Sequence, residues 1–397
     1  MGVSGVVENL YGTVVLVAEF GPVGGTRTYV EQLISFYGKR ARSVVVIGTN
    51  GADQLLDRYA NHFGASYIPI EDICGDPNVL GKLYFPFRLR DETRLLQDFV
   101  TSRNPDLVVA SVGTPGRFLG LMGFRKPSLY ILHTYPMANK KKVLAIAIRL
   151  VVPFLVPKGA SFITVSEFSK NQMIDVWGLG FLKKKISVIH NTAGPEVEKI
   201  RQLRSCSVVL TVGHVVQYKN PMAWVAMATE VIAKLPGTQF FWVGPGPMLE
   251  ECRQQVVDED LTDSIFFVGE VSDVSPYYEK ASVYCQPSLV ESLSLSVLDA
   301  MRHGIPSVVS AVGGLPEVVD DNTTGFVVSS YDETSFSGRV IELLESPLLR
   351  GSMGARAREV YTEQFSLEHW EGSLEQFHKR LGSSEVESRK KRKFGVE

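Results

Sequence analysis

Two carboxylates, Glu291 and Asp299, stand eight positions apart in the stretch ESLSLSVLDAM (291–301). The apolar residues of this stretch recur at helical spacing, which predicts an amphipathic helix whose first turn is capped by Ser292 or Ser294. A helix start of this kind carries unpaired backbone N–H groups, which favour the binding of a phosphate. A carboxylate beside it can accept hydrogen bonds from sugar hydroxyls. The stretch therefore predicts a site for a phosphorylated ligand.

Other loops that follow strand-like runs carry residues suited to the same ligand. Lys219 can neutralise a phosphate, and His133 ends another strand-like run. The glycines of GGTRT (24–28) and AVGGLPE (311–317) let a ligand approach the backbone closely. Together these loops predict a phosphorylated ligand, and spacing alone leaves its identity open.

Several enzyme classes lack their fingerprint in this chain. The loop GPVGGT (21–26) is GxxGG rather than the GxGxxG of nicotinamide dehydrogenases, and the next strand-like run ends in GTN, without an acid for a ribose. The chain has neither the GxxxxGK[ST] of P-loop enzymes nor the GxSxG of the usual α/β-hydrolases. These three classes are therefore excluded.

The composition is that of an ordinary globular protein. A chain of 397 residues, 45% hydrophobic and 21% charged, predicts two domains. A net charge of −2 gives no reason to expect nucleic-acid binding. The four cysteines form no CxxC pair and the seven histidines no HExxH, so we expect neither disulfides nor a metal site. Without a recognisable signal peptide, we expect a cytoplasmic protein.

The elements that must position these residues alternate regularly. Short β-branched runs are separated by helical stretches in both halves of the chain, and the pattern loosens only around 187–206. The runs are 13–20, 43–50, 106–113, 128–134 and 160–166 in the first half, and 208–215, 238–244, 264–270, 282–288 and 306–312 in the second. This alternation predicts an α/β protein with two doubly wound, Rossmann-like domains facing an interdomain cleft, which is the natural place for a ligand.

The run PSLVESLSLSVLDAMRHGIPSVVSAVGGLPEVVDDNTTGFVV (287–328) resembles the signature of the GT-B glycosyltransferases of family 4. Shorter matches occur in the right order along the chain: GG (24–25), HT (133–134), ITVSEFSK (163–170), ISVIHN (186–191), VGHVVQYKN (212–220), FWVGPGP (241–247) and FVGEVSD (267–273). The resemblance extends to about residue 381, and it rests on the combination rather than on any single motif.

The resemblance implies an acceptor-binding domain at 1–190 and a nucleotide-sugar-binding domain at 191–365. A helix near 366–382 is expected to pack back on the first domain, and residues 383–397 are expected to be a disordered basic tail. The implied reaction is the retaining transfer of a sugar from a nucleotide-diphosphate sugar to a glycan or lipid-linked acceptor, in bacterial surface polysaccharide biosynthesis. It would need no metal or other cofactor, and it would rely on electrostatic stabilisation of the departing diphosphate.

The resemblance also implies roles for residues of the second half. Glu291 would contact hydroxyls of the transferred sugar, and Asp299 would contact the ribose. The amides of Ser294 and Leu295 would hold the diphosphate, whose charge Lys219 would offset.

Four further residues complete the implied site. Gly24 and Gly25 would let the first loop close over the phosphates, Val271 would lie beside the base, and His133 would face the sugar. With Lys219 and Glu291, His133 would be catalytic.

The chain departs from the family pattern at several positions. His214, which would contact the diphosphate of the donor, stands where an arginine is usual, Asp299 replaces a glutamate, and Ser292 and Ser294 replace glycines. These departures leave two alternatives open, a GT-B epimerase of sugar nucleotides and a catalytically weakened homologue that acts as a binding or assembly partner. Asp299 could also be a solvated helix residue.

Peripheral contact with the inner face of the cell membrane is a separate hypothesis. Lysines 140–142 precede an apolar run at 143–157 that is too short to span a bilayer, and RKKRK (389–393) lies near the C-terminus. The alternative is that 143–157 forms a helix buried against the sheet and that the basic tail only aids solubility.

Overall fold

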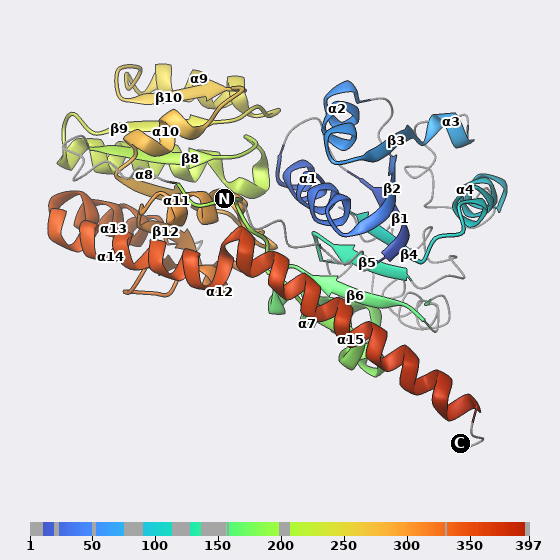
Figure 1. The fold of residues 1–397 in the computed structure, drawn as a ribbon. Coiled ribbons are helices and arrows are strands. Elements are labelled where there is room, and N and C mark those ends of the chain that lie inside the picture. Colours follow the sequence, from blue (N-terminus) through green and yellow to red (C-terminus); the bar gives the residue numbers. More distant parts are fainter. Residues whose placement is uncertain are drawn as a thin grey trace, which may run out of the picture. The chain divides into compact units, whose positions relative to one another are not determined.

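The chain divides into two compact units, residues 1–189 and residues 190–397. The computed structural model describes residues 11–19, 24–49, 53–74, 90–112, 128–135, 156, 159–197, 207–329 and 332–393. Each unit contains one parallel sheet with helices against it, which confirms the predicted α/β class (Figure 1).

The first unit is built on a seven-stranded parallel sheet in the order β3-β2-β1-β4-β5-β6-β7. Its strands are β1 (Tyr11–Ala18), β2 (Ala41–Gly48), β3 (Ala65–Pro69), β4 (Leu107–Val112), β5 (Ser128–Leu132), β6 (Ser161–Thr164) and β7 (Ile186–Val188). Its described helices are α1 (Gly25–Gly38), α2 (Gln54–His62), α3 (Glu71–Cys74), α4 (Arg90–Ser102), α7 (Glu167–Trp177) and the 3-10 helix η2 (Gly180–Lys185).

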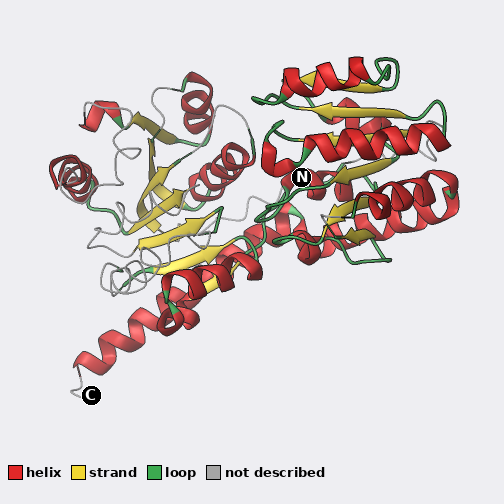
Figure 2. Ribbon diagram, turned by 180° about the vertical axis from the view of Figure 1, so that it is seen from behind, coloured by secondary structure: helices red, strands yellow, loops and turns green. Residues whose placement is uncertain are grey.

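The central strands of this sheet are buried on both faces. Residues 14–18 of β1 are all fully buried, and so are residues 108–110 of β4. Strands of a parallel sheet are covered by helices on both sides, so their sequences read as continuous apolar runs rather than alternating ones. Figure 2 shows helices lying against the strands in each unit.

The second unit is built on a six-stranded parallel sheet in the order β10-β9-β8-β11-β12-β13. Its strands are β8 (Val208–Val212), β9 (Gln239–Val243), β10 (Ile265–Gly269), β11 (Val283–Gln286), β12 (Ser307–Ser310) and β13 (Gly325–Val328). Its described helices are η3 (Gln217–Lys219), α8 (Pro221–Lys234), α9 (Leu249–Asp258), α10 (Ser275–Lys280), α11 (Leu295–Arg302), α12 (Leu315–Val318), α13 (Glu333–Glu345), α14 (Pro347–Val360), the π-helical turn η4 (Tyr361–Phe365) and α15 (Leu367–Lys393).

The strand order of the second unit reverses at β8, which has β9 on one side and β11 on the other. This is the Rossmann order, in which ligands bind beyond the carboxyl ends of the strands at the point of reversal. The loops after β8 and β11 flank that point. They carry the predicted residues Lys219 and Glu291.

An aromatic cluster between helix α8 and strands β9 and β10 supports the loop after β8. Trp224 lies edge-to-face with Trp242 and with Phe267, at ring-centroid distances of 5.3 and 5.5 Å. Trp242 is fully buried, and its indole N–H donates to the carbonyl oxygen of Gly213 at 2.9 Å. This bond ties the start of the loop to the core.

The loops after β8 and β9 are packed backbone against backbone. A β-carbon at Gly244 would overlap the carbonyl group of Gly213, and a β-carbon at Gly246 would overlap the backbone of Val215. The stretch VGPGP (243–247) therefore needs its glycines for close packing of two loops rather than for a dinucleotide fingerprint.

The C-terminal helix α15 differs from the prediction for the tail. The sequence predicted disorder from residue 383, whereas the helix continues to Lys393. Trp370, Leu374 and Phe377 on its first half are buried, and the helix groups with the second unit. That residues 366–382 pack on the first domain stays a prediction, as does the cleft between the domains.

Candidate functional site

Lys219 and Glu291 form an ion pair across the point where the strand order reverses. Lys219 ends the short helix η3 after β8, and Glu291 lies in the loop between β11 and α11. The Lys219 Nζ donates to Glu291 Oε2 at 2.5 Å, and the two side chains are only 14% and 13% exposed. Neither residue is therefore an ordinary surface residue. The structure brings the predicted phosphate-binding cation and the predicted sugar-binding acid into direct contact.

A network of buried polar groups fixes the carboxylate of Glu291. Gln286, the last residue of β11, donates from its amide to Glu291 Oε2 at 2.8 Å, and the backbone N–H of Ser292 donates to Oε1 at 3.2 Å. The amide oxygen of Gln286 accepts from Ser294 Oγ at 2.8 Å and from the hydroxyl of Tyr284 at 3.2 Å. Sequence reasoning missed Gln286 and Tyr284. The available signal was a polar glutamine at the end of a run otherwise suited to a buried strand.

Ser294 caps helix α11, as one of the two predicted alternatives. It precedes Leu295, and its Oγ accepts a hydrogen bond from the backbone N–H of Val297 at 3.4 Å. The residue is buried, and the same hydroxyl donates to Gln286. The start of α11 is therefore linked through Gln286 to the carboxylate of Glu291. The predicted diphosphate contact and the predicted sugar contact are held by the same hydrogen-bond network.

The glycine loop 311–317 lies directly against the backbone of Glu291. Gly313 has φ +59°, in the left-handed region, and a β-carbon there would overlap the carbonyl oxygen of Glu291. Glycine meets both demands because it lacks a β-carbon. The GG-x-x-E motif thus supports the loop that carries Glu291.

Asp299 lies one to two turns into α11 and is paired within the helix. Its carboxylate accepts from the guanidinium of Arg302, which also donates to the carbonyl oxygen of Pro195 at 3.0 Å. Burial raises the pKa of Asp299 to about 6, and the neighbouring Arg302 acts in the opposite direction. Its side chain is 21% exposed, so Asp299 is not a solvated helix residue. Sequence reasoning did not consider Arg302.

Two further predicted donor contacts follow strands of the same sheet. His214, two residues after β8, is exposed and makes no hydrogen bond or ion pair with any residue that the structure describes. Val271 follows β10 and is half-buried. Their assignment to the diphosphate and the base stays a prediction.

In the first unit, Gly24 immediately precedes helix α1, which begins at Gly25. Gly24 has φ +108°, a conformation that other residues rarely adopt. Arg27, in the first turn of α1, donates to Asp53 Oδ2 at 2.6 Å and to Glu31 Oε1 at 3.1 Å. This ion-pair network ties the start of α1 to the start of α2, so the end of the glycine loop is held in place.

His133 follows β5 in the same unit and is buried. Its Nε2 lies 2.8 Å from Ser111 Oγ, and its ring lies edge-to-face with Tyr29 at a centroid distance of 4.5 Å. Burial lowers the pKa of His133 to about 4, so the imidazole is neutral at physiological pH. A neutral imidazole can donate or accept a hydrogen bond, but it cannot supply a positive charge to a phosphate.

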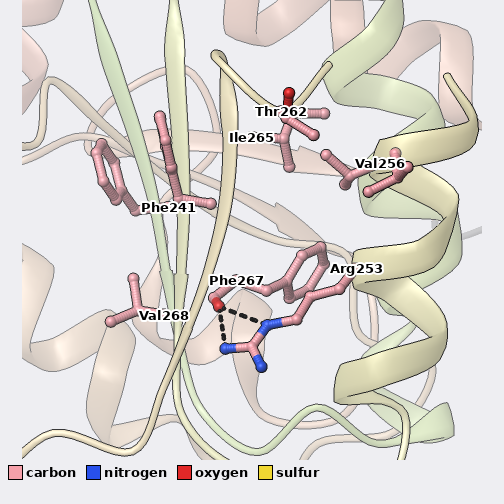
Figure 3. Close-up of a pocket in the computed structure, with 9 residues that line it drawn as sticks. Phe241, Arg253, Val256, Thr262, Ile265, Phe267 and Val268 are labelled. Atoms are coloured by element: carbon pink, nitrogen blue, oxygen red, sulfur yellow. Dashed lines mark hydrogen bonds between the residues drawn. The ribbon is translucent and has the colours of Figure 1, made fainter. Parts of the chain in front are cut away.

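A separate pocket of about 380 Å³ lies at the outer strand β10 (Figure 3). Its walls are mainly apolar, and Arg253 in the lining donates from Nε and Nη2 to the carbonyl oxygen of Phe267 at 3.1 and 2.8 Å. The lining residues are Phe241, Arg253, Val256, Val257, Thr262, Ile265, Phe266, Phe267 and Val268. None of the predicted site residues is among them, so this pocket is distinct from the Lys219–Glu291 site.

Across the described ranges, no three or more His, Cys, Asp or Glu side chains gather in a way that could hold a metal ion. Among those same residues, no helix is long and apolar enough to cross a membrane. The apolar run 143–157 and the lysines 140–142 lie almost wholly outside the described residues, and so do the side chains of 389–393. Metal independence and the membrane role of these segments stay predictions.

Comparison with known proteins identifies the fold and the family. The structure of Anabaena Alr3699/HepE in complex with UDP superposes with a TM-score of 0.71 over 92% of this chain and 98% of that chain, at 18% identity. The fold is that of the GT-B glycosyltransferases. Family models described as Glycosyltransferase Family 4 and Glycosyl transferases group 1 match residues 23–196 and 206–346. The chain belongs to glycosyltransferase family 4, which confirms the resemblance read from its motifs.

Curated relatives match over part of their length. N-acetyl-alpha-D-glucosaminyl L-malate synthase of Bacillus anthracis is 34% identical over 146 residues, 37% of each protein. The UDP-Gal:alpha-D-GlcNAc-diphosphoundecaprenol alpha-1,3-galactosyltransferase of Escherichia coli is 28% identical over 180 residues, 42% of this chain and 46% of that protein. The chain thus spans less than half the length of each of these two relatives.

Proposed function

We propose that this protein transfers a sugar from a nucleotide-diphosphate sugar to a hydroxyl group of a glycan or lipid-linked acceptor. The observation that carries the proposal is the enclosed Lys219–Glu291 pair at the point where the strand order reverses, beside the start of α11. A cation, a helix start and an acid suit a diphosphate linked to a sugar. Family membership supports the same reaction class.

In the proposed reaction, the bond between the anomeric carbon and the diphosphate oxygen breaks while the acceptor oxygen attacks from the same face. The proton of the acceptor hydroxyl passes to the departing diphosphate oxygen, so no covalent intermediate with the protein forms. Lys219 and the N-terminus of α11 stabilise the charge that develops on the diphosphate. Glu291, held by Gln286 and the Ser292 amide, binds sugar hydroxyls and orients the ring.

Three further residues contact the donor in this proposal. Asp299 accepts from ribose hydroxyls, Val271 lies beside the base, and neutral His133 donates a hydrogen bond to the sugar. No metal takes part. We propose bacterial surface polysaccharide biosynthesis as the setting, because one relative is named for transfer to a diphosphoundecaprenol-linked sugar.

Two observations favour a second candidate, a catalytically weakened homologue. His214 replaces an arginine and is exposed, and Asp299 is already engaged by Arg302. Both features reduce the number of groups available to a donor nucleotide. A protein of this kind would keep the fold and lose its affinity for nucleotide sugars.

Thermal stability of the purified chain with UDP, GDP, ADP, CDP or dTDP and their sugar conjugates, in the presence of a chelator, separates the two candidates. A ligand at a hundred times its dissociation constant adds about 2.7 kcal/mol of stability. We expect one base to stabilise the wild type, and its sugar conjugate to add stability that Glu291→Ala loses. Glu279→Ala, an exposed acid on α10, is the matched control and should keep the full response.

If no nucleotide or conjugate raises the melting temperature, the transferase proposal fails and the weakened homologue is favoured. If a conjugate binds equally to wild type and Glu291→Ala, the role given to Glu291 is wrong. Conversion of the nucleotide sugar into an isomer in the absence of any acceptor would instead identify an epimerase.

A further inference from the structure

The 3-10 helix η2 (GFLKKK, 180–185) exposes an aromatic ring beside a run of cations. It lies in the first unit between α7 and β7. Phe181 is 64% exposed, and Lys183, Lys184 and Lys185 are also exposed. Neither Lys183 nor Lys184 is engaged in an ion pair with a described residue. The turn therefore presents a hydrocarbon ring and unneutralised positive charge on one short segment.

The backbone of this turn is held from both sides. Gly178 ends α7 in the left-handed conformation, and the backbone N–H of Leu179 donates to the carbonyl oxygen of Ile174 at 3.1 Å. Leu182 donates to the carbonyl oxygen of Leu179 at 2.9 Å, and both leucine side chains are buried. In a 3-10 helix residues three apart lie on the same side, so burial of these leucines directs Phe181 outward. The exposure of Phe181 is thus built into the turn.

Other exposed apolar side chains lack this electrostatic setting. Among the described residues, the large ones are Leu55, Leu95, Phe181, Tyr218, Val257 and Leu348. Leu55 lies between Asp53 and Asp57, and Val257 is followed by Asp258 and Glu259. Within this set, Phe181 alone lies two residues before an uninterrupted run of three lysines. With a net charge of −2 on the whole chain, the positive charge here is local.

We propose that η2 docks the protein on an anionic lipid bilayer, with the Phe181 ring in the headgroup region and Lys183 and Lys184 against lipid phosphates. Aromatic side chains favour the boundary between headgroups and acyl chains, and basic residues near an anionic surface each strengthen binding by about fivefold. The inference rests on the proposed function in one respect: docking would bring the enzyme to a lipid-linked acceptor. Docking itself does not require an occupied donor site.

The test is flotation of the full-length protein with vesicles of phosphatidylcholine alone or of equal parts phosphatidylcholine and phosphatidylglycerol. We expect the wild type to float with the anionic vesicles only. Replacing both lysines, Lys183→Gln with Lys184→Gln, should weaken binding by about 25-fold, and Phe181→Ser by about tenfold. A double replacement of the exposed lysines Lys234 and Lys280 in the second unit removes the same charge and should leave binding unchanged.

Three outcomes overturn the proposal. They are absence of flotation of the wild type, equal loss in the η2 and control variants, and binding to neutral and anionic vesicles alike. Loss of binding by the lysine variant but not by Phe181→Ser would overturn the place given to the Phe181 ring in the headgroup region. Nucleotide-dependent stabilisation, measured on the same variants, should remain at the wild-type level. Glu291→Ala should still float, so failure of docking and failure of the donor site are separable.

Discussion

At the scale of single residues, Asp299 is the position where the chain departs most informatively from its family. A glutamate at this place would reach one methylene further, whereas the aspartate is turned toward Arg302 on the next turn of the same helix. Arg302 is in turn held by the carbonyl oxygen of Pro195. Burial raises the pKa of Asp299, and the ion pair with Arg302 offsets part of this rise, so that the resulting pKa is about 6. Arg302 is therefore what favours the ionised form of a buried acid.

Removing this arginine should have a pH-dependent effect on stability. The folded-state pKa of Asp299 lies above its ordinary value of 3.8, so its ionisation opposes folding as pH rises through about 6. We expect Arg302→Met to lower the free energy of unfolding by about 1–3 kcal/mol at about pH 7.5. The loss should shrink at about pH 5, where Asp299 is largely protonated and the ion pair no longer contributes.

Urea denaturation of wild type and variant at the two pH values measures this difference. The matched control is Arg356→Met, which breaks an exposed ion pair with Glu359 in the same unit and should show no such pH dependence. If Arg302→Met lowers the free energy of unfolding equally at both pH values, packing rather than charge accounts for the role of Arg302.

At the scale of elements, the loop that carries Glu291 depends on a neighbouring loop for its shape. The AVGGLPE loop meets it at Gly313, where a positive φ and an overlapping carbonyl group both exclude a side chain. We expect Gly313→Ala to lower stability by at least about 2 kcal/mol, since the backbone of Glu291 must shift. The variant should also lose the extra rise in melting temperature that the sugar conjugate gives over the nucleotide alone.

The control for that substitution is Gly338→Ala. Gly338 lies in helix α13, and a β-carbon there meets open space. Alanine in a helix is favoured over glycine by about 0.5–1 kcal/mol, so this variant should be slightly more stable than the wild type. Thermal unfolding of both variants checks the pair, and a Gly313→Ala protein as stable as the wild type would contradict the packing described.

The sequence predicted the elements and the loops better than the side-chain partners. Continuous apolar runs and their spacing are properties of the chain itself, and Lys219 and Glu291 were found because each follows such a run. The bond of Gln286 to Glu291 and that of Arg302 to Pro195 depend on tertiary contacts, which no local pattern encodes. For the tail, high charge predicted disorder. Glu, Lys and Arg are also good helix formers, and a helix already nucleated on buried Trp370 can extend through them.

At the scale of the whole molecule, each unit has its own sheet and its own buried core. The proposed contacts to the base, ribose and diphosphate lie almost entirely in the second unit. We therefore expect a bound nucleotide to stabilise that unit preferentially, because a ligand stabilises the structure that binds it. Hydrogen exchange should show increased protection in β8–β13 and little change in β1–β7. Equal protection of both sheets would show that the two units unfold as one.

The interlocked loops after β8 and β9 have a consequence for how this chain can vary. Gly213 and Val215 on one loop lie backbone to backbone with Gly244 and Gly246 on the other. A recombinant that receives one of these loops from a relative, without its companion, would bring together surfaces that were shaped for different neighbours. We therefore expect the two loops to be exchangeable between relatives only as a pair, because each is shaped to fit the backbone of the other.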